Sequence, residues 1–194
     1  MVDIKKMKKK VCLLGDASVG KTSLVRRYVY DLFDDKYITT LGAKVTKKEI
    51  NIEYTKMVDK PIKVNIILSI WDILGQKNES AERVRPVYYG GANGALVVCD
   101  ITRRETFDNL EEWIKSFISV TQKVPVVILG NKIDLYKQAE VYYEDLEKFS
   151  KERYFPVFLT SAKTNSNVES AFYRLTEMML VESISDSSSQ KIEK

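Results

Sequence analysis

Short apolar runs alternate with stretches of helical periodicity along most of the chain. Four runs have the length and continuous apolar character of buried strands, at residues 11–14, 95–99, 126–129 and 157–159. Two longer extended segments, residues 43–52 and 64–71, are joined by a polar connection around residues 59–61 and predict a long β-hairpin. The pattern therefore predicts about six strands.

Between the strands, apolar residues recur at helical spacing. The apolar positions of four such stretches are Leu24, Val25, Tyr28 and Leu32; Phe107, Leu110, Trp113, Phe117 and Val120; Tyr142, Leu146 and Phe149; and Val168, Ala171, Phe172, Leu175 and Met178. Thr102 with Glu105 has the spacing of a capping box, and Ser166 with Glu169 opens the last helix. With about five helices in βα alternation, we expect an α/β fold whose mostly parallel sheet is covered on both faces.

Length and composition indicate one folded domain with short extensions. The chain has 194 residues, of which 44% are hydrophobic and 30% are charged, as in ordinary globular proteins. No apolar stretch approaches the ~18 residues of a membrane span. We expect a basic N-terminal segment at 1–10, a folded domain at 11–181 and a flexible polar tail at 182–194, because the Ser-rich end is poor in apolar residues.

Residue usage narrows the chemistry that the chain can perform. The sequence has no histidine, which excludes a histidine-based metal site and Ser–His–Asp hydrolysis. Cys12 and Cys99 lie in apolar runs, which indicates buried thiols in a reduced, cytoplasmic setting. Of a net charge of +4, much comes from the lysines between residues 5 and 10. That run is typical of a solvated start; weak contact with anionic lipid stays open, and we expect no nucleic-acid partner.

The segment after the first apolar run has the pattern of a phosphate-binding loop. From Gly15 to Thr22 it reads GDASVGKT, with two glycines, a lysine and a hydroxyl residue at the required spacing. Glycines let backbone N–H groups turn toward an anion, and the following helix adds its positive N-terminal end. Lys21 is expected to reach the β- and γ-phosphates, and Thr22 to offer its hydroxyl to Mg²⁺. A chance glycine turn is the alternative, and the base is not identified.

Two further segments offer groups for a metal ion and a terminal phosphate. Asp72 ends the hairpin, where a carboxylate can hold Mg²⁺ through its water shell. Gly75 lets its backbone N–H approach a phosphate, and Gln76 can both donate and accept, so it can orient an attacking water. Thr40 offers a hydroxyl to Mg²⁺ and an N–H to the γ-phosphate. Each segment alone also fits an ordinary turn.

Two later segments suit a purine base. Asp134 can accept the adjacent N1–H and 2-amino donors of guanine, a pair that adenine lacks. The stem of Lys132 can lie over the ring, Asn131 can tie neighbouring loops, and residues 161–163 can donate a backbone N–H to the guanine carbonyl. The four patches follow four different strands at their carboxyl ends, the edge where open parallel sheets bind ligands.

In this order, GDASVGKT, the threonine loop, WDILGQ, NKID and TSAK resemble the motifs of the Ras superfamily of small GTPases. The stretches YYGGANGALVVCDIT and TSAKTNSNVESAF are especially similar to its Rab-like branch. The resemblance covers about residues 11–180 and implies the P-loop NTPase (small G-protein) fold. It implies a switch in trafficking or signalling that binds GTP or GDP with Mg²⁺ and hydrolyses GTP, and whose γ-phosphate holds two switch loops.

The resemblance also implies roles for individual residues. Gln76 positions the attacking water, Thr22 and Thr40 bind Mg²⁺, and Asp72 supports the ion through water. Phe33 matches the aromatic residue at the base edge of the site. The nucleotide-binding residues are Gly15, Ala17, Ser18, Val19, Gly20, Lys21, Thr22, Ser23, Phe33, Thr40, Gly75, Asn131, Lys132, Asp134, Ser161, Ala162 and Lys163.

Several positions depart from the family pattern. Ile73 and Leu74 replace a small pair such as Thr-Ala, and Lys77 replaces a glutamate. The stretch from Gln76 to residue 88 and the hairpin are longer than usual. The bulk of Leu74 keeps open an alternative, a guanine-nucleotide-binding module with little or no intrinsic hydrolysis. A phosphate-loop kinase acting on ATP is disfavoured, because the guanine-selecting carboxylate would then have no role.

The resemblance implies partners as well. An exchange factor, a GTPase-activating protein and effectors are expected to act through the two switch loops. Hydrolysis is expected to be slow without an activating protein, because no residue is an obvious internal arginine finger. We expect a monomer in the cytoplasm, at most peripheral to a membrane. No cysteine follows Cys99, so the C-terminal prenylation of the Rab branch is not expected on this sequence.

Overall fold

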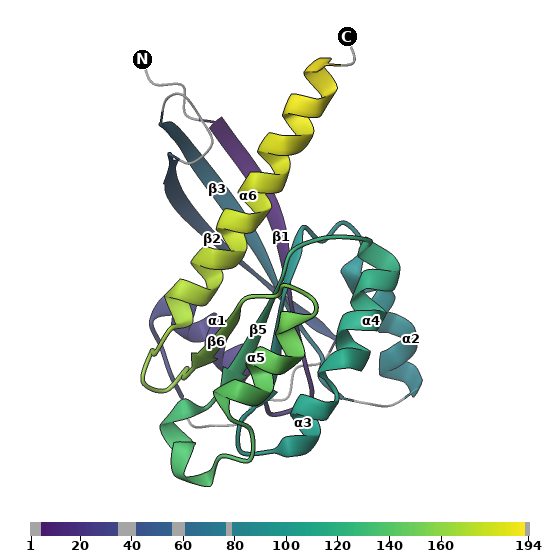
Figure 1. Ribbon diagram of the computed structural model, residues 1–194, viewed down its shortest axis with the longest axis vertical. Coiled ribbons are helices and arrows are strands. Elements are labelled where there is room, and N and C mark those ends of the chain that lie inside the picture. Colours follow the sequence, from purple (N-terminus) through teal and green to yellow (C-terminus); the bar gives the residue numbers. More distant parts are fainter. Residues whose placement is uncertain (1–4, 35–41, 56–60, 77–78, 193–194) are drawn as a thin grey trace.

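One six-stranded sheet organises the computed structural model, which describes residues 5–34, 42–55, 61–76 and 79–192 (Figure 1). The strands lie in the order β2-β3-β1-β4-β5-β6, with β2 antiparallel to β3 and all other neighbours parallel. The predicted hairpin and the mostly parallel sheet are confirmed. The strands are β1 Lys5–Leu14, β2 Ala43–Tyr54, β3 Ile62–Ile73, β4 Gly94–Asp100, β5 Val126–Asn131 and β6 Val157–Thr160.

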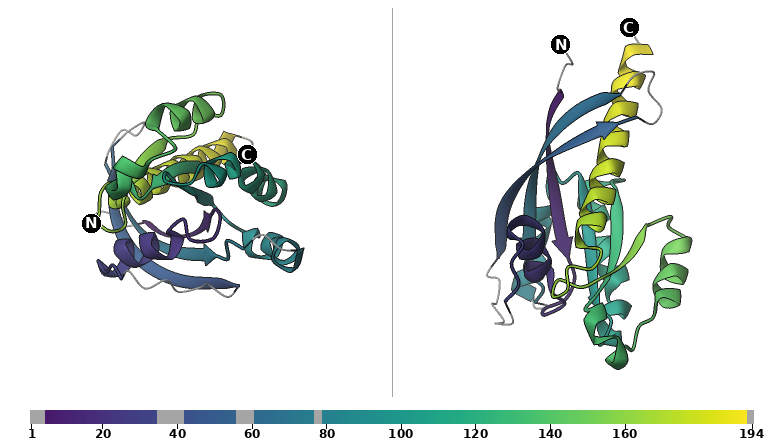
Figure 2. Two further views of the ribbon diagram at one scale, coloured as in Figure 1. Left: turned by 90° about the horizontal axis from the view of Figure 1, so that it is seen from below. Right: turned by 90° about the vertical axis from the view of Figure 1, so that its left-hand side faces the viewer.

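Helices cover both faces of this sheet, as predicted (Figures 1 and 2). Helices α1 and α6 pack on one face, whereas α2, α4 and α5 pack on the other. None of the helices in the described ranges is long and apolar enough for a membrane crossing. The helical elements are α1 Lys21–Tyr30, α2 Glu79–Tyr89, α3 Arg104–Asp108, α4 Leu110–Thr121, the 3₁₀ helix η1 Ile133–Gln138, α5 Tyr143–Lys151 and α6 Val168–Ile192.

The helix predicted around Phe107 to Val120 is divided into α3 and α4 at Asn109. The amide of Asn109 donates to the Asp16 carboxylate (2.6 Å), so the junction residue faces the loop after β1. The predicted capping box at Thr102 is wrong. Helix α3 starts after Arg103, which makes no side-chain cap, and the Thr102 hydroxyl instead donates to Asp100 (2.7 Å).

Helix α2 has no counterpart among the predicted helical stretches. Its buried positions include Arg85 and Tyr89, four residues apart, whereas Val84 and Val87 are exposed. Because an arginine occupies the inward face and valines the outward face, the apolar periodicity that indicates a helix is missing. Pro86 inside the helix adds a further signal against helix in the sequence.

Both ends of the chain extend the fold further than expected. Strand β1 begins at Lys5, not at Val11, because the β3 backbone offers hydrogen-bond partners along Lys5–Lys10 whatever side chains these residues carry. Helix α6 continues to Ile192 and covers the lengthened strands (Figure 2). Lys9 donates to Ser183, and Ile184 packs against the core. Residues 5–10 and 182–192 therefore form regular structure, and the expected boundaries of a domain at 11–181 stay a prediction.

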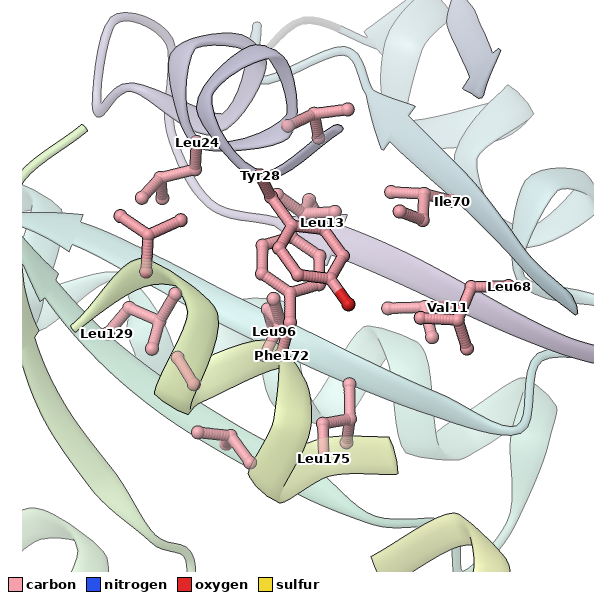
Figure 3. Close-up of a cluster of buried hydrophobic side chains, with 14 of the residues drawn as sticks. Val11, Leu13, Leu24, Tyr28, Leu68, Ile70, Leu96, Leu129, Phe172 and Leu175 are labelled. Carbon is pink, nitrogen blue, oxygen red and sulfur yellow. The ribbon is translucent and has the colours of Figure 1, made fainter. Parts of the chain in front are cut away.

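The core consists of one apolar cluster on each face of the sheet. Beneath α1 and α6, the ring of Tyr28 stacks on that of Phe172, with centroids 3.9 Å apart and an interplanar angle of 4° (Figure 3). The second cluster, under α2, α4 and α5, includes Trp113. Cys12 and Cys99 are buried, as predicted, and burial raises the pKa of both thiols to about 12. The parallel strands deliver the loops that follow them to one edge of the sheet.

Candidate functional site

A pocket of about 340 Å³ opens at the carboxyl edge of the sheet. The loops after β1, β3, β5 and β6 and the start of α1 surround it. Ligands of open parallel sheets bind at this edge, so its position fits the prediction. The predicted residues that line the pocket are Ala17, Ser18, Gly20, Lys21, Thr22, Ser23, Phe33, Gly75, Gln76, Asn131, Lys132, Asp134, Ala162 and Lys163.

Four predicted residues lie behind the pocket wall and contact residues that line it. The Gly15 carbonyl accepts from Lys21 (2.6 Å), and the Val19 carbonyl accepts from Asn131 (2.9 Å). Asp72 accepts from Thr22, and Ser161 donates to Asp134 (2.6 Å). Thr40 lies outside the described residues. Gly15, Val19, Asp72 and Ser161 thus hold residues that line the pocket, without lining it themselves.

The loop between β1 and α1 requires glycine at both ends of its motif. Gly15 has a φ of 133° and Gly20 a φ of 99°, values that side chains with a Cβ rarely adopt. A Cβ on Gly20 would lie only 2.3 Å from Nδ2 of Asn131. The loop therefore closes tightly over the end of β5. Helix α1 begins directly afterwards at Lys21, so the N-terminal end of the helix points at the pocket.

Lys21 is the buried cation of this loop, with only 6% of its surface exposed. Its ammonium group donates to the carbonyls of Gly15 (2.6 Å) and Asp16 (2.7 Å). Burial lowers the pKa of Lys21 to about 8, and the charges of Asp72 and Asp16 oppose that shift. A phosphate beside the ammonium group would favour its charged form, which burial disfavours. The surroundings of Lys21 therefore suit an anion.

Oxygen donors for a metal ion meet at the start of α1. The Thr22 hydroxyl donates to Oδ2 of Asp72, a carboxylate that is buried at the end of β3. In the described part of the chain, no group of three or more His, Cys, Asp or Glu side chains forms a metal cage. Because Mg²⁺ keeps several waters and uses few carboxylates beside a phosphate, one hydroxyl and one carboxylate fit this ion.

The segment after β3 lies against the phosphate loop. A Cβ on Gly75 would lie 2.5 Å from the Asp16 carbonyl and from the ammonium of Lys21, so only glycine fits without displacement. Gln76 follows with an exposed side chain at the pocket rim. Both bulky residues that depart from the family pattern line the pocket; Ile73 is otherwise fully buried in the core, whereas Leu74 is partly exposed.

Asn131 ties neighbouring loops together, as predicted. It is buried, its amide donates to the Val19 carbonyl (2.9 Å), and its Oδ1 accepts from the Thr160 hydroxyl (3.1 Å). The side chain therefore connects the phosphate loop with the ends of β5 and β6.

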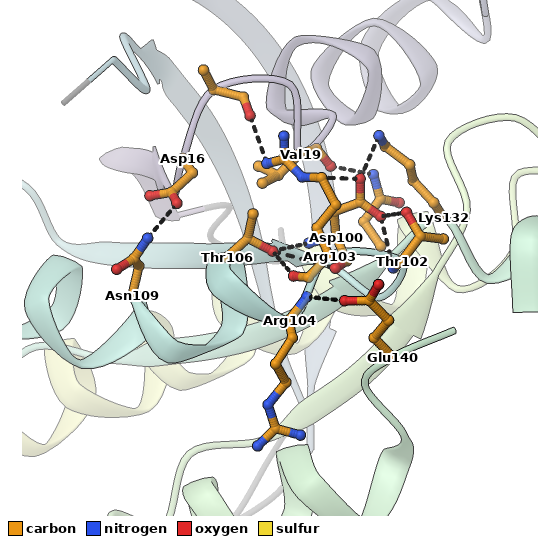
Figure 4. A network of polar contacts seen from close by, with 12 residues as sticks. Asp16, Val19, Asp100, Thr102, Arg103, Arg104, Thr106, Asn109, Lys132 and Glu140 are labelled. Carbon is orange, nitrogen blue, oxygen red and sulfur yellow. Dashed lines mark hydrogen bonds and ion pairs between the residues drawn. The ribbon is translucent and has the colours of Figure 1, made fainter. Parts of the chain in front are cut away.

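Lys132 joins a polar network beneath the pocket (Figure 4). Its ammonium lies 2.6 Å from Oδ2 of Asp100, a buried carboxylate that also faces Arg103 at 3.8 Å. Arg103 in turn donates to the Ala17 carbonyl (3.0 Å). The ion pair fixes the direction of the Lys132 stem along the pocket wall.

Asp134 also lines the pocket and presents an exposed carboxylate. Its Oδ1 accepts from Ser161, at the start of the loop after β6. Arg27 of α1 fixes that loop by donating to the carbonyls of Ala162 (2.8 Å) and Lys163 (3.1 Å). A carboxylate is thereby held beside a rigid stretch of backbone, an arrangement suited to reading the edge of a base.

Four lining residues escaped the sequence analysis: Arg26, Leu32, Asp34 and Leu135. Arg26 follows Thr22 by four residues, so helical spacing alone would have indicated its position on the same face. Leu135 directly follows a predicted base-side residue. Leu32 and Asp34 lie in the irregular segment after α1. Helical spacing predicted Leu32 on the buried face of that helix, but α1 ends at Tyr30 and Leu32 is exposed.

All residues that line the pocket lie within residues 10–181, which match the family model "Ras family". The chain belongs to the Ras family. This Ras-family chain is 37% identical over 172 residues to the Ras-related protein Rab-21 of Homo sapiens, covering 88% of this chain and 72% of the relative. It is 38% identical to Rab-21 of Dictyostelium discoideum (90% and 77%) and 35% identical to Rab-13 of Bos taurus (90% and 81%), each over 175 residues.

These comparisons fix the class of the protein. It is a Rab-like small GTPase of the Ras superfamily with the P-loop NTPase fold, a molecular switch that binds guanine nucleotide and hydrolyses GTP. Nucleotide, exchange factors, activating proteins and effectors are the partner classes of such a protein. The alternative of a binding module without hydrolysis is not favoured by these relatives.

Proposed function

We propose that this protein is a trafficking switch whose pocket binds GTP or GDP with Mg²⁺, the phosphates lying at Lys21 and the guanine at Asp134. The observation that carries the proposal is the pocket itself, whose lining combines a buried cation in a glycine loop with a separate, exposed carboxylate. A nucleotide presents the complementary groups, with an anionic chain at one end and a base with two donors at the other.

At the phosphate end, residues 15–20 wrap the anion with backbone N–H groups, and Lys21 exchanges its contacts with the loop carbonyls for phosphate oxygens. Thr22 and Asp72, which share a hydrogen bond, would hold Mg²⁺, Thr22 with its hydroxyl and Asp72 through water. Mg²⁺ neutralises phosphate charge when bound. Thr40 remains a proposed second hydroxyl ligand and lies outside the described residues.

At the base end, Asp134 accepts the two guanine donors, with Ser161 holding its other face. The Lys132 stem lies along one side of the ring and Phe33 packs at its edge, since both line the pocket. Ala162 and Lys163 supply the backbone next to the guanine carbonyl, on a loop that Arg27 holds in place. Discrimination against adenine follows, because adenine would leave the carboxylate unpaired.

For hydrolysis, Gly75 lies beside the γ-phosphate and Gln76 orients the attacking water. Leu74 adds bulk at the same rim, and we expect the unaided rate to be slow. An activating protein that supplies an arginine would add about 10³ to 10⁵ in rate. We further propose a monomer in the cytoplasm, at most peripheral to a membrane, with residues 11–181 as the GTPase domain.

Single-turnover hydrolysis of GTP with Mg²⁺ tests the hydrolytic part. We expect GDP to accumulate slowly with the unchanged protein. The rate in Gln76→Leu should be lower by about tenfold or more, because leucine cannot orient water. Gln138→Leu is the matched control, since Gln138 is exposed on η1 and does not line the pocket. Equal rates in the Gln76 and Gln138 variants would remove Gln76 from this role.

A further inference from the structure

Arg85 of α2 is buried, with 4% of its surface exposed, and its guanidinium lies on the ring of Trp113 of α4, 4.0 Å from the centroid. Arginine is almost never fully buried unless it is paired. No carboxylate among the described side chains forms an ion pair with it, and its Nε has no hydrogen-bond partner there. The aromatic face is therefore the principal described partner of this charge.

The same guanidinium reaches the segment after β3. Its Nη2 donates to the backbone carbonyl of Gln76, which ties the beginning of this segment to α2. A hydrogen bond from a charged donor to a carbonyl in a buried setting is stronger than one between neutral groups. Arg85 thus fixes the backbone that carries the proposed hydrolytic side chain.

Trp113 is anchored in turn to the phosphate loop. Its indole N–H donates to Oδ1 of Asp16 (2.7 Å), and the amide of Asn109 donates to Oδ2 (2.6 Å; Figure 4 shows the latter). Asp16 is buried, and its backbone carbonyl accepts from Lys21. One residue of the phosphate loop therefore contacts the cation of the site through its backbone and α4 through its side chain.

These contacts form a continuous polar path that we call the Asp16 relay, comprising Asp16, Trp113, Arg85 and the carbonyl of Gln76. An indole whose N–H donates to a carboxylate gains electron density on its face, so Asp16 strengthens the attraction between the ring and the arginine. The path also closes on itself, because Gly75 lies against the Asp16 backbone. The two loops are therefore connected to each other through packed, buried groups.

We infer that Arg85 is a positioning residue for GTP hydrolysis, because through the Asp16 relay it holds the Gln76 backbone in register with the phosphate loop. The inference deepens the proposed function and rests on Gln76 being the hydrolytic residue. It requires that loss of the Arg85 charge slow hydrolysis while nucleotide affinity stays nearly constant. Arg85 itself does not line the pocket.

The test compares Arg85→Met, which keeps length but removes the charge, with Arg85→Lys, which keeps a cation. Arg153→Met is the matched control, because Arg153 also stacks on an aromatic ring, that of Phe149 at 4.6 Å, and does not line the pocket. We expect Arg85→Met to lower the single-turnover rate about tenfold with GDP affinity within about twofold, a split typical of a group that acts in the transition state only. Arg85→Lys should recover most of the rate.

A second readout follows Trp113 directly. In the Trp71→Phe background, Trp113 is the sole indole, and its emission should change when a non-hydrolysable GTP analogue replaces GDP. Arg85→Met should abolish that change. If Arg85→Met does not fold, Trp113→Phe is used in the hydrolysis assay instead. Phenylalanine keeps an aromatic ring but lacks the N–H that donates to Asp16, so this variant should also slow hydrolysis.

The outcomes separate the inference from the function on which it rests. A wild-type protein that binds no GDP would overturn the proposed function. Wild-type binding and hydrolysis with equal rates in Arg85→Met and Arg153→Met would overturn the positioning role alone. A loss of GDP affinity parallel to the loss of rate would assign Arg85 to structural support of the loop and would likewise overturn it.

Discussion

At the scale of single residues, Lys21 is the group on which fold and ligand act in opposite directions. Burial lowers its pKa to about 8, because the charged form loses water that the protein only partly replaces. A bound phosphate favours the charged form and raises the pKa again. At pH values between the pKa of Lys21 in the free protein and its higher pKa in the complex, nucleotide binding is coupled to the uptake of a proton.

This linkage predicts the pH dependence of GDP binding. Below pH 7 the free protein already carries the proton, so affinity is flat, whereas above pH 8 it falls by up to about tenfold per pH unit as Lys21 of the free protein deprotonates. Titration calorimetry between pH 6.5 and 9.5 measures it. Lys21→Met binds more weakly and lacks this component, so any slope that it retains belongs to the nucleotide. Parallel profiles for the two proteins would contradict the assignment.

Asp134 predicts a change of base preference. In Asp134→Asn the amide can still accept from Ser161 through its oxygen and can donate to the 2-oxygen of xanthine. We expect preference to move from GTP toward XTP by about tenfold or more in a competition assay. Asp108→Asn, an exposed carboxylate on α3, should leave the preference for GTP intact. An unchanged order in the Asp134 variant would place the base elsewhere.

The positions of residues that ligand chemistry selects were predictable from the sequence, because phosphate and guanine restrict residue type and spacing. Lys21, Asn131 and Asp134 all line the pocket. The role of Asp16 was not predictable in this way. Its partner Trp113 lies 97 positions further along the chain and belonged to an ordinary apolar face, so only the packed structure reveals the contact.

At the scale of elements, the packing of α1 against α6 includes one stacked pair of rings, Tyr28 and Phe172. Phe172→Ala removes a fully buried ring and should lower the free energy of unfolding by about 3–5 kcal/mol. Tyr173→Ala, at the next position but 48% exposed, should change it by less than about 0.5 kcal/mol. Denaturant unfolding at fixed nucleotide concentration measures both, and equal effects would mean that the stack contributes little.

Elements were predictable where burial follows from apolar side chains. Strands β4 and β5 are buried at every position, and their continuous apolar runs predicted both strands. Helix α2 was missed because Arg85 occupies its buried face, and the beginning of β1 was missed because backbone pairing with β3 requires no apolar residue. In both places the stabilising partner belongs to another element.

At the scale of the whole molecule, β1 and the end of α6 run beside each other along the lengthened strands (Figure 2). Deleting residues 182–194 removes the contact of Ser183 with Lys9 and the packing of Ile184. We expect a loss of about 1–2 kcal/mol in the free energy of unfolding, with GDP affinity unchanged. Thermal unfolding and calorimetry on the two chains measure this. An unaltered midpoint would make the segment an independent tail.

The central claim is that a glycine-framed loop with Lys21 holds the phosphates of a nucleotide whose base Asp134 selects. Titration calorimetry of the purified, nucleotide-stripped protein with GDP, GTP and ATP in the presence of Mg²⁺ tests this claim most directly. The account predicts binding of both guanine nucleotides and affinity for ATP that is about 10³-fold weaker or less. Absence of heat with GDP and GTP, or a preference for ATP, would contradict it.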